Sequence, residues 1–292
     1  MKIALFGHQF NSFYLKKIVR LVNLLIKKNT ALQIHETLYY IIGPHLKQKN
    51  NILLFDRYGQ IDKDTDLFIS LGGDGTLLDA ATIVRDSNIP ILGINIGKLG
   101  FLSSVSIDET ENSIDAILDQ KFDIDKRTLV KLEEPTSLFG NLDFGLNEFS
   151  VIKRDTSTMI TIKTYIDDYF LNTYWADGLI ISTPTGSTGY SLSCGGPIIS
   201  PESKNFVITP IANHNLTVRP IVIPDNCRIK LKVEDINKDF LCVLDSRSKA
   251  LSAPAELTIC KTDFQINLVN LENKDFFKTI RNKLAWGLDK RN

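Results

Sequence analysis

Three glycines and one aspartate interrupt an apolar run in "SLGGDGTLL" (70–78). Glycine lets a ligand approach the backbone closely, and the N–H groups at the start of a helix attract anions. The turn therefore predicts a phosphate site, with the candidate residues Gly72, Gly73, Gly75 and Thr76. Beside phosphates, the carboxylate of Asp74 could accept the proton of an attacking hydroxyl or help to hold Mg²⁺, and a cap on the following helix is the structural alternative.

A second dense stretch, "WADGLIISTPTGSTGYSLSCGGPIISP" (175–201), follows a short apolar strand with many hydroxyl and glycine residues. Such a loop supplies hydrogen-bond donors on a permissive backbone, and Tyr190 is the large ring in it that could stack on a base. The composition predicts a binding loop; a solvated turn with Ser and Thr caps is the alternative. Upstream, Asn147 and Glu148 could grip the edge of a base or a ribose diol, although two exposed polar groups at a strand start are the simpler interpretation.

The remaining chemistry-bearing residues form no recognisable centre. The four histidines have no metal-ligand spacing, and the four cysteines form no CxxC pair. A zinc site, a disulfide framework and a catalytic triad are therefore not expected, and the protein ligands of any metal are unknown. The glycine turn also matches neither a Walker A loop nor GxGxxG.

Alternating strand and helix patterns must position the glycine turn. "KIALFG" (2–7) reads as a strand, and the helical pattern after it has Asn11 or Ser12 as its cap. "DLFISL" (66–71) is a second strand, "TLLDAATIVRD" a helix and "IPILGINIG" (89–97) a third strand. This βαβ succession predicts a parallel sheet covered by helices, with the turn at the carboxyl end of a strand, where ligands bind in open α/β sheets.

From about residue 122 the period changes to two. Ile160, Ile162 and Ile166 alternate with polar residues, as do Ile229 and Leu231 with their neighbours, which is typical of half-buried antiparallel strands. The tail "DFFKTIRNKLAWGL" returns to helical spacing. We therefore predict an α+β or α/β fold with three parts: an N-terminal α/β (Rossmann-like) domain over 1–122, a mostly antiparallel β domain over 123–271, and a helix over 272–292 that packs back on the first domain.

The charge balance and the length of the apolar runs limit the kinds of partner and location that we expect for this protein. Lys plus Arg equals Asp plus Glu at 34 each, so nothing global indicates nucleic acid or an anionic membrane as a partner. No apolar run approaches the ~18 residues that a membrane-spanning helix needs, and the first ten residues have too short an apolar core for a signal peptide. We expect a cytoplasmic protein.

The three motifs, in this order and spacing, resemble those of the NAD kinases: a GGDGT turn, then an Asn-Glu pair, then DG…TPTGST-x-Y…GGP. The resemblance covers nearly the whole chain, including "GINIGKLGFL" (93–102), "RPIVIP" (219–224) and the C-terminal tail. GGDGT alone is shared with diacylglycerol kinases, whereas the TPTGST stretch is much more specific. The implied reaction transfers the γ-phosphoryl of ATP to the 2′-hydroxyl of the adenosine ribose of NAD, giving NADP. The resemblance also implies a divalent metal cation, expected to be Mg²⁺, as cofactor.

The resemblance also implies roles for individual residues. Asp74 would activate the acceptor hydroxyl within the phosphate turn. The implied NAD contacts are Asp74, Gly75, Phe101, Asn147, Glu148, Asp177, Thr188, Gly189, Tyr190, Ser191, Ser193 and Arg247. Several positions depart from the family pattern. Gly189 and Cys194 replace common alanines, and Trp175 replaces a residue that is often basic. The segment "LDSRS" (244–248) replaces an Asp-Gly-Gln-like segment, so the contact that the side-chain amide of that segment normally makes falls to Arg247 or is absent.

Two other functions are compatible with parts of the pattern. A GGDGT-type lipid kinase would need membrane-surface features that the sequence lacks. A non-catalytic NAD(H)-binding sensor could use every motif except Asp74. The resemblance further implies a homodimer or homotetramer. The sequence leaves open the preference between NAD and NADH, the use of polyphosphate in place of ATP, the identity of the metal and feedback regulation.

Overall fold

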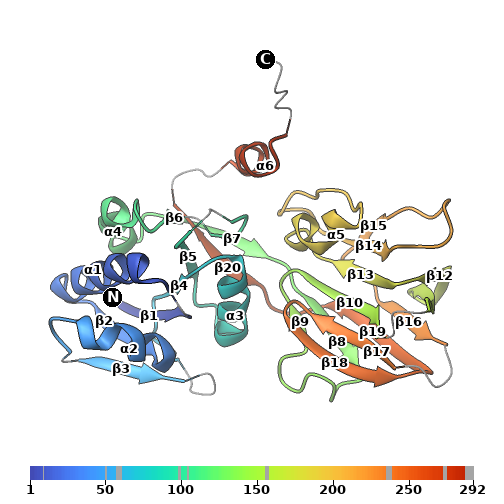
Figure 1. Cartoon of the computed structure of the whole chain (residues 1–292), viewed down its shortest axis with the longest axis horizontal. Coiled ribbons are helices and arrows are strands. Elements are labelled where there is room, and N and C mark those ends of the chain that lie inside the picture. Colours follow the sequence, from blue (N-terminus) through green and yellow to red (C-terminus); the bar gives the residue numbers. More distant parts are fainter. Residues whose placement is uncertain are drawn as a thin grey trace. The chain divides into compact units, whose positions relative to one another are not determined.

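The chain forms two compact units in a computed structural model. The structure describes residues 1–8, 10–49, 51–56, 61–97, 100–103, 105–154, 158–234, 239–271 and 275–286. Unit 1 comprises residues 1–126 and 266–292, and unit 2 comprises residues 127–265 (Figure 1). These limits differ from the expected 122/123 and 271/272, because residues 123–127 and 266–270, which lie inside the range expected for the β domain, form strands in the sheet of unit 1.

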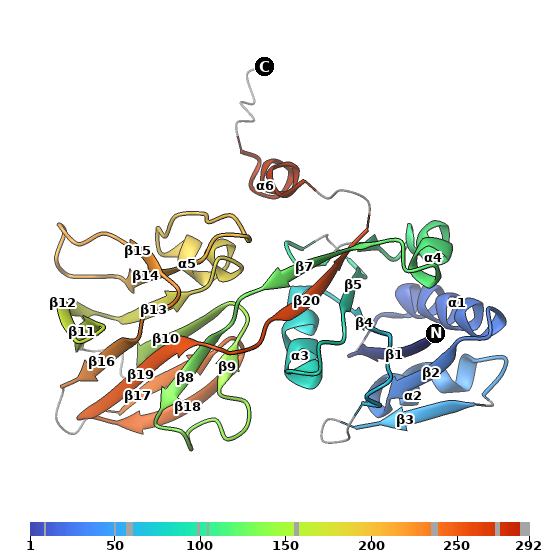
Figure 2. The same cartoon turned by 180° about the vertical axis from the view of Figure 1, so that it is seen from behind.

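An eight-stranded sheet forms the centre of unit 1. Its spatial order is β3-β2-β1-β4-β5-β20-β7, and β6 pairs with β5. The strands are β1 (Lys2–Gly7), β2 (Ala31–His35), β3 (Ile52–Phe55), β4 (Leu67–Leu71), β5 (Ile91–Asn95), β6 (Val105–Ser106), β7 (Asp123–Arg127) and β20 (Ile266–Asn270). The pairs from β3 to β20 and the β5–β6 pair are parallel, as predicted. Figure 2 shows β20 and β7 side by side.

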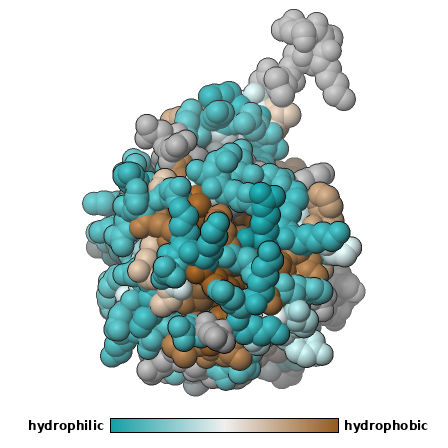
Figure 3. Space-filling model, turned by 90° about the vertical axis from the view of Figure 1, so that its left-hand side faces the viewer, coloured by the Kyte–Doolittle hydropathy of each residue, from teal (hydrophilic) through white to brown (hydrophobic). Residues whose placement is uncertain are grey.

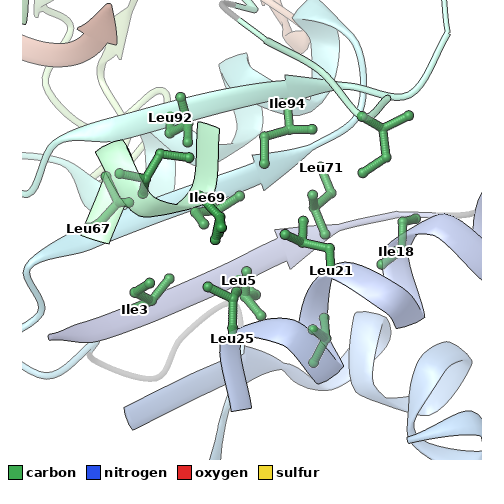
Figure 4. Close-up of a cluster of buried hydrophobic side chains, with 14 of the residues drawn as sticks. Ile3, Leu5, Ile18, Leu21, Leu25, Leu67, Ile69, Leu71, Leu92 and Ile94 are labelled. Atoms are coloured by element: carbon green, nitrogen blue, oxygen red, sulfur yellow. The ribbon is translucent and has the colours of Figure 1, made fainter. Parts of the chain in front are cut away.

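Helices cover both faces of this sheet. They are α1 (Ser12–Lys27), α2 (Glu36–Ile42), α3 (Asp74–Val84) and α4 (Thr110–Leu118), with a short 3-10 helix at Gly43–His45. Helix α6 (Phe276–Leu284) follows β20 along the chain. Asn11 caps α1 by accepting a hydrogen bond from the Tyr14 N–H, which confirms the predicted helix start. Side chains from one face of β1, β4 and β5 pack against α1 (Figure 4). The opposite face meets α3, because a Cβ on Gly93 would lie 2.8 Å from Leu77 Cδ1.

The C-terminal helix is present where the periodicity predicted it. Asp275 caps α6 by accepting from the Phe277 N–H, and Ile280 is its buried side chain. Phe277 is 63% exposed. The apolar positions of α6 are thus only partly covered within the described part of the chain.

One side of unit 1 ends in an open strand. β3 lies at the edge of the sheet, and Leu53 and Leu54 on it are 58% and 50% exposed. Figure 3 views the molecule from this side and shows hydrophobic surface interrupted by polar side chains. Polar neighbours of this kind limit unwanted pairing of an edge strand.

Unit 2 consists of two antiparallel sheets. One has the order β15-β14-β13-β10-β17-β18 and the other β12-β11-β16-β19-β8-β9. The first comprises β10 (Glu148–Lys153), β13 (Gly178–Ser182), β14 (Asn205–Ile211), β15 (Ile221–Pro224), β17 (Asp239–Leu244) and β18 (Arg247–Ser252). The second comprises β8 (Val130–Glu134), β9 (Phe144–Gly145), β11 (Ile160–Ile166), β12 (Tyr169–Ala176), β16 (Ile229–Val233) and β19 (Ala255–Lys261).

The two sheets of unit 2 enclose one core. Phe149 and Phe206 from the first sheet pack with Ile162, Leu231 and other apolar side chains from the second. The alternation predicted for β11 and β16 is confirmed by their burial. After β13, the chain forms a 3-10 helix (Gly186–Thr188) and the short α5 (Tyr190–Ser193) at the end of the first sheet. The mixed architecture predicted from the sequence is therefore confirmed.

Candidate functional site

The glycine turn of unit 1 lies at the carboxyl end of β4, between that strand and α3. The strand order reverses between β1 and β4: β2 and β3 lie beyond β1 on one side, and β5 lies beyond β4 on the other. Ligands bind at such switch points in open α/β sheets. A crevice of about 350 Å³ opens at this edge. Residues from the ends of β1, β4 and β5 and the start of α3 line it, among them His8, Gly72, Gly73, Thr76 and Asn95.

His8 stands at this crevice and was not predicted from the sequence. Its Nε2 atom lies 2.9 Å from Asp79 Oδ2 on α3. The ring also meets Phe6 edge-on, with centroids 4.9 Å apart. These contacts fix the imidazole at the rim of the phosphate turn. No local pattern indicates this role for His8, because the pairing joins residues 71 positions apart.

Asp74 is held by three backbone N–H groups outside its own helix. Its Oδ2 accepts from Phe101 N at 2.8 Å, and its Oδ1 accepts from Leu102 N at 3.1 Å and Ser103 N at 3.4 Å. Gly73 is the N-cap of α3 and Asp74 its first residue. The helix-cap alternative is therefore wrong for this side chain: its carboxylate joins the turn to the segment after β5, and Phe101 takes part through its backbone.

A divalent cation fits this turn only through one protein carboxylate. The described residues contain no cluster of three or more His, Cys, Asp or Glu side chains that could enclose a metal ion. Asp74 accepts a single N–H bond at Oδ2, so that oxygen keeps a lone pair for a cation. Mg²⁺ commonly takes one or two protein carboxylates and completes its shell with water and substrate phosphates. The donor set is therefore compatible with Mg²⁺ carried largely by a phosphate ligand.

In unit 2, Glu148 is the first residue of strand β10, and Asn147 directly precedes it. Both residues are half-buried. Glu148 Oε2 is buried and has no hydrogen-bond partner among the described residues. Burial, followed by the nearby charge of Asp245, raises the pKa of Glu148 to about 8. At neutral pH this side chain is therefore largely protonated in the free protein, although it lies at a site where a ligand is expected.

We predict that Glu148→Gln removes a pH-dependent loss of stability. The pKa of Glu148 in the folded protein lies above its ordinary value of 4.5. The protonated side chain therefore makes its full contribution to folding stability below about pH 4.5, and this contribution is lost as the pH rises through about 8. The melting temperature of the wild type should fall over this window, and that of the variant should fall by several degrees less. Thermal melts at about pH 5 and pH 8.5 test this, with the exposed Glu202→Gln as control; identical pH trends in all three proteins would contradict it.

The hydroxyl-rich loop places several predicted residues around Tyr190. Tyr190 begins α5 and its side chain is exposed (41%). Burial raises its pKa, and the charges of Asp177 and Glu148 contribute, so both carboxyl groups lie near it. Asp177 pairs with Lys153, with 2.6 Å between Nζ and Oδ1. Thr188 and Gly189, which precede Tyr190 in the chain, are half-buried, and Ser193 is exposed. This part of the expected site is thus brought together within unit 2.

Two predicted contacts are corrected by the structure. Ser191 is completely buried, and its hydroxyl lies 2.8 Å from that of Thr209, so it packs the loop onto β14 rather than facing a ligand. Arg247 donates to the backbone carbonyls of Leu142 and Phe144. Its guanidinium therefore holds the chain that leads to Asn147, and it is not available to replace the amide of the family pattern.

Models of two domains match most of the chain. Residues 25–122 match the ATP-NAD kinase N-terminal domain, and residues 146–271 match the ATP-NAD kinase C-terminal domain. The NAD kinase of Cytophaga hutchinsonii is 47% identical over 293 residues, and that of Flavobacterium psychrophilum is 48% identical over 294 residues, each alignment covering 100% of both chains. The chain belongs to the NAD kinase family.

Solved NAD kinase structures share its fold. The yeast NADH kinase complexed with NADH has a TM-score of 0.86 at 22% identity and covers 99% of this chain and 89% of its own. The NAD kinase from Archaeoglobus fulgidus in complex with ATP has a TM-score of 0.75 at 24% identity and covers 98% and 99%. Across the described residues of this NAD kinase family member, no helix combines the length and hydrophobicity that crossing a membrane would require.

Proposed function

We propose that this NAD kinase family member transfers the γ-phosphoryl group of ATP to the 2′-hydroxyl of the adenosine ribose of NAD. The observation that carries the proposal is the fixed carboxylate of Asp74 in a glycine turn beside the crevice of unit 1. A phosphate turn alone supports binding. A single immobilised carboxylate within it adds the group that proton transfer from a hydroxyl needs.

The chemistry assigned to the turn is proton acceptance with charge stabilisation. Asp74 takes the proton of the 2′-hydroxyl while the 2′-oxygen forms a bond to the γ-phosphorus. The bond between the γ-phosphorus and the oxygen that bridges it to the β-phosphate breaks, and ADP leaves. The N–H groups at the start of α3 and the glycines Gly72, Gly73 and Gly75 face the phosphoryl oxygens, with Thr76 beside them. A divalent cation, when bound, neutralises phosphate charge; Asp74 is the side chain in this turn that would contact it.

The constellation of unit 2 is assigned to the acceptor. Tyr190 offers an exposed ring for stacking on a base. Asn147 and Glu148 offer a donor and an acceptor to a base edge or a ribose diol, and Asp177 lies close to the same ring. Thr188, Gly189 and Ser193 complete the expected contacts.

The deciding experiment is an end-point assay of the purified protein. It contains Mg²⁺, ATP and either NAD or NADH, and an NADP-specific dehydrogenase detects the 2′-phosphorylated product. Product from NAD at a catalytic rate supports the proposal, and the comparison with NADH gives the acceptor preference. Absence of product with both acceptors, and again with polyphosphate as donor, would contradict it and favour an NAD(H)-binding sensor.

Tyr190→Ala should raise the apparent KM for NAD by about 5- to 30-fold, because loss of base stacking costs on the order of 1 to 2 kcal/mol. The kcat and the KM for ATP should change little, since the ring belongs to unit 2 and the phosphate turn to unit 1. Tyr169→Ala, which removes an 81% exposed ring on β12, is the matched control. An unchanged KM for NAD in Tyr190→Ala would remove Tyr190 from the acceptor site.

We also propose that the chain assembles into a homodimer or homotetramer, as the family resemblance implies. Light scattering coupled to size-exclusion chromatography measures the mass directly. A mass equal to the 32.9 kDa of one chain at assay concentration would contradict this part of the proposal.

A further inference from the structure

One carboxylate in unit 2 holds the backbone of three successive residues. Asp245 Oδ2 accepts from Leu146 N at 2.8 Å, and Oδ1 accepts from Asn147 N at 2.8 Å and Glu148 N at 3.1 Å. Asp245 occupies the turn between β17 and β18 at a positive φ of 52°, a conformation that Asp and Asn adopt more readily than most residues. The turn therefore aims a carboxylate at the start of the neighbouring strand.

The same segment is fixed from its other side by the hydroxyl-rich loop. Thr183 Oγ1 donates to the Leu146 carbonyl at 2.6 Å, and Thr183 N donates to the Asn147 carbonyl at 2.9 Å. The N–H groups of this segment thus point to Asp245, while the carbonyls of Leu146 and Asn147 point to Thr183 and the carbonyl of Glu148 accepts from Asp245 N at 3.1 Å. A backbone bonded on both sides has little freedom, so the directions of its side chains are set as well.

The two side chains set by this backbone converge on one point. A Cβ built on Gly189 would lie 3.5 Å from Glu148 Oε2 and 3.8 Å from Asn147 Nδ2. Oε2 has no hydrogen-bond partner within the described residues. A buried polar atom without a partner is costly unless a ligand or water completes its bonds. The space beside Gly189 is therefore where a ligand would meet both groups.

We propose that Asp245 is a positioning residue for the acceptor: by binding three consecutive N–H groups, it fixes the backbone that aims Asn147 and Glu148 at the dinucleotide. This inference rests on the proposed function, because it takes NAD as the ligand of unit 2. Asp245 touches no reacting atom and acts through the two side chains. Its neighbour Arg247 supports it by binding the carbonyls of Leu142 and Phe144 just upstream.

The pH dependence of NAD affinity provides a second measurement of the proposed role of Asp245. The titratable groups that interact with Glu148 are Asp245, Tyr190 and Cys194; Asp177 in turn acts on Tyr190, and Arg247 acts on Asp245. Burial is the main cause of the raised pKa of Glu148, and the charge of Asp245 adds to it. A base amino group or ribose hydroxyl donates to Glu148 and so favours its carboxylate. The affinity for NAD should rise with pH through about 8.

Two substitutions of Asp245 test separately the position of its carboxylate and the charge that it carries. Asp245→Asn tolerates the positive φ but removes the charge and turns one acceptor into a donor facing an N–H group. The KM and the Kd for NAD at about pH 8.5 should rise by about 10- to 100-fold, as expected for unpaired buried groups, and the pH midpoint of NAD affinity should move down. Asp245→Glu keeps the charge but displaces it, so it should raise the Kd for NAD and leave the midpoint in place.

The KM for ATP and the kcat should stay within about threefold of wild type in both variants. Asp239→Asn, an exposed carboxylate on the same hairpin, is the matched control and should leave all three parameters unchanged. Parallel losses in kcat and in both KM values that follow the melting temperature would show a folding role and overturn the inference. If Asp245→Asn does not fold, the Kd of Asp245→Glu decides, and a wild-type value overturns the inference.

Measurements on the wild-type protein distinguish a failure of the proposed function from a failure of the inference about Asp245. Calorimetric titration with NAD and the end-point assay are run first on wild type. No binding or no product there contradicts the proposed function, and with no binding the inference falls with it. Normal binding and turnover in wild type, together with a wild-type Kd and pH midpoint in Asp245→Asn, contradict the inference about Asp245 alone.

Discussion

Asp74→Asn is expected to lower kcat by about two to four orders of magnitude, the range that general acid–base catalysis contributes. The amide cannot accept the proton of the 2′-hydroxyl, and it carries no charge to place a cation. NAD binding should survive within a few-fold, because proton transfer matters in the transition state rather than in the ground state. Single-turnover rates and calorimetric titration with NAD measure the two quantities separately.

The carboxylate's three backbone bonds make a control necessary. In Asp74→Asn the new amide group faces one N–H donor, so some loss of stability accompanies the substitution. Asp86→Asn, at an exposed position just past α3, tests for general effects of removing a charge there. If Asp74→Asn lost NAD binding and turnover together with its melting temperature, Asp74 would be a structural residue of the turn.

Gly100→Ala should lower kcat by about 100-fold without changing a reacting group. A Cβ at residue 100 would lie only 1.8 Å from Asp74 Oδ1, so the carboxylate must leave its three N–H partners. A displacement of about 1 Å at a catalytic group can cost this much in rate. Steady-state kinetics measure the effect, and a crystal structure of the variant would show where Asp74 has moved.

Gly43→Ala is the matched control for this substitution. Gly43 lies in the short 3-10 helix after α2, and the atoms nearest to a Cβ there belong to the ring of Tyr39, the nearest at 3.2 Å. Its kcat should equal that of wild type. Wild-type turnover in Gly100→Ala would mean that the observed place of Asp74 is not the one used in catalysis.

Local patterns predicted the parts of the fold that depend on neighbouring residues. The apolar runs of β1, β4 and β5, the Asn11 cap and the alternation in β11 and β16 all follow from short-range periodicity. The strand β20 lies inside the range expected for the β domain, because five residues so far along the chain give no local sign that they pair with β5 of the parallel sheet. β7, "DIDKR", carries mostly polar side chains and gives no signal of a place in the parallel sheet.

The site was predictable in its residue types but not in its bonds. Glycines and hydroxyls mark the loops that bind ligands, and Asp74 is visible as the carboxylate of the turn. Its partners are 27 to 29 residues away, and those of Asp245 are 97 to 99 residues away. Contacts over such separations are set by tertiary packing, which explains why Arg247 was assigned to the ligand and Asp245 was overlooked.

Unit 1 is assembled from two pieces of chain, and this has a consequence for synthesis on the ribosome. β20 lies between β5 and β7 in its sheet, yet it follows the whole of unit 2 in sequence. Unit 2 is contiguous and can complete its hydrogen bonding as soon as residue 265 has emerged. The sheet that supports the turn of Asp74 must wait for residues 266–270, so translation delivers unit 2 in finished form before this turn has its complete support.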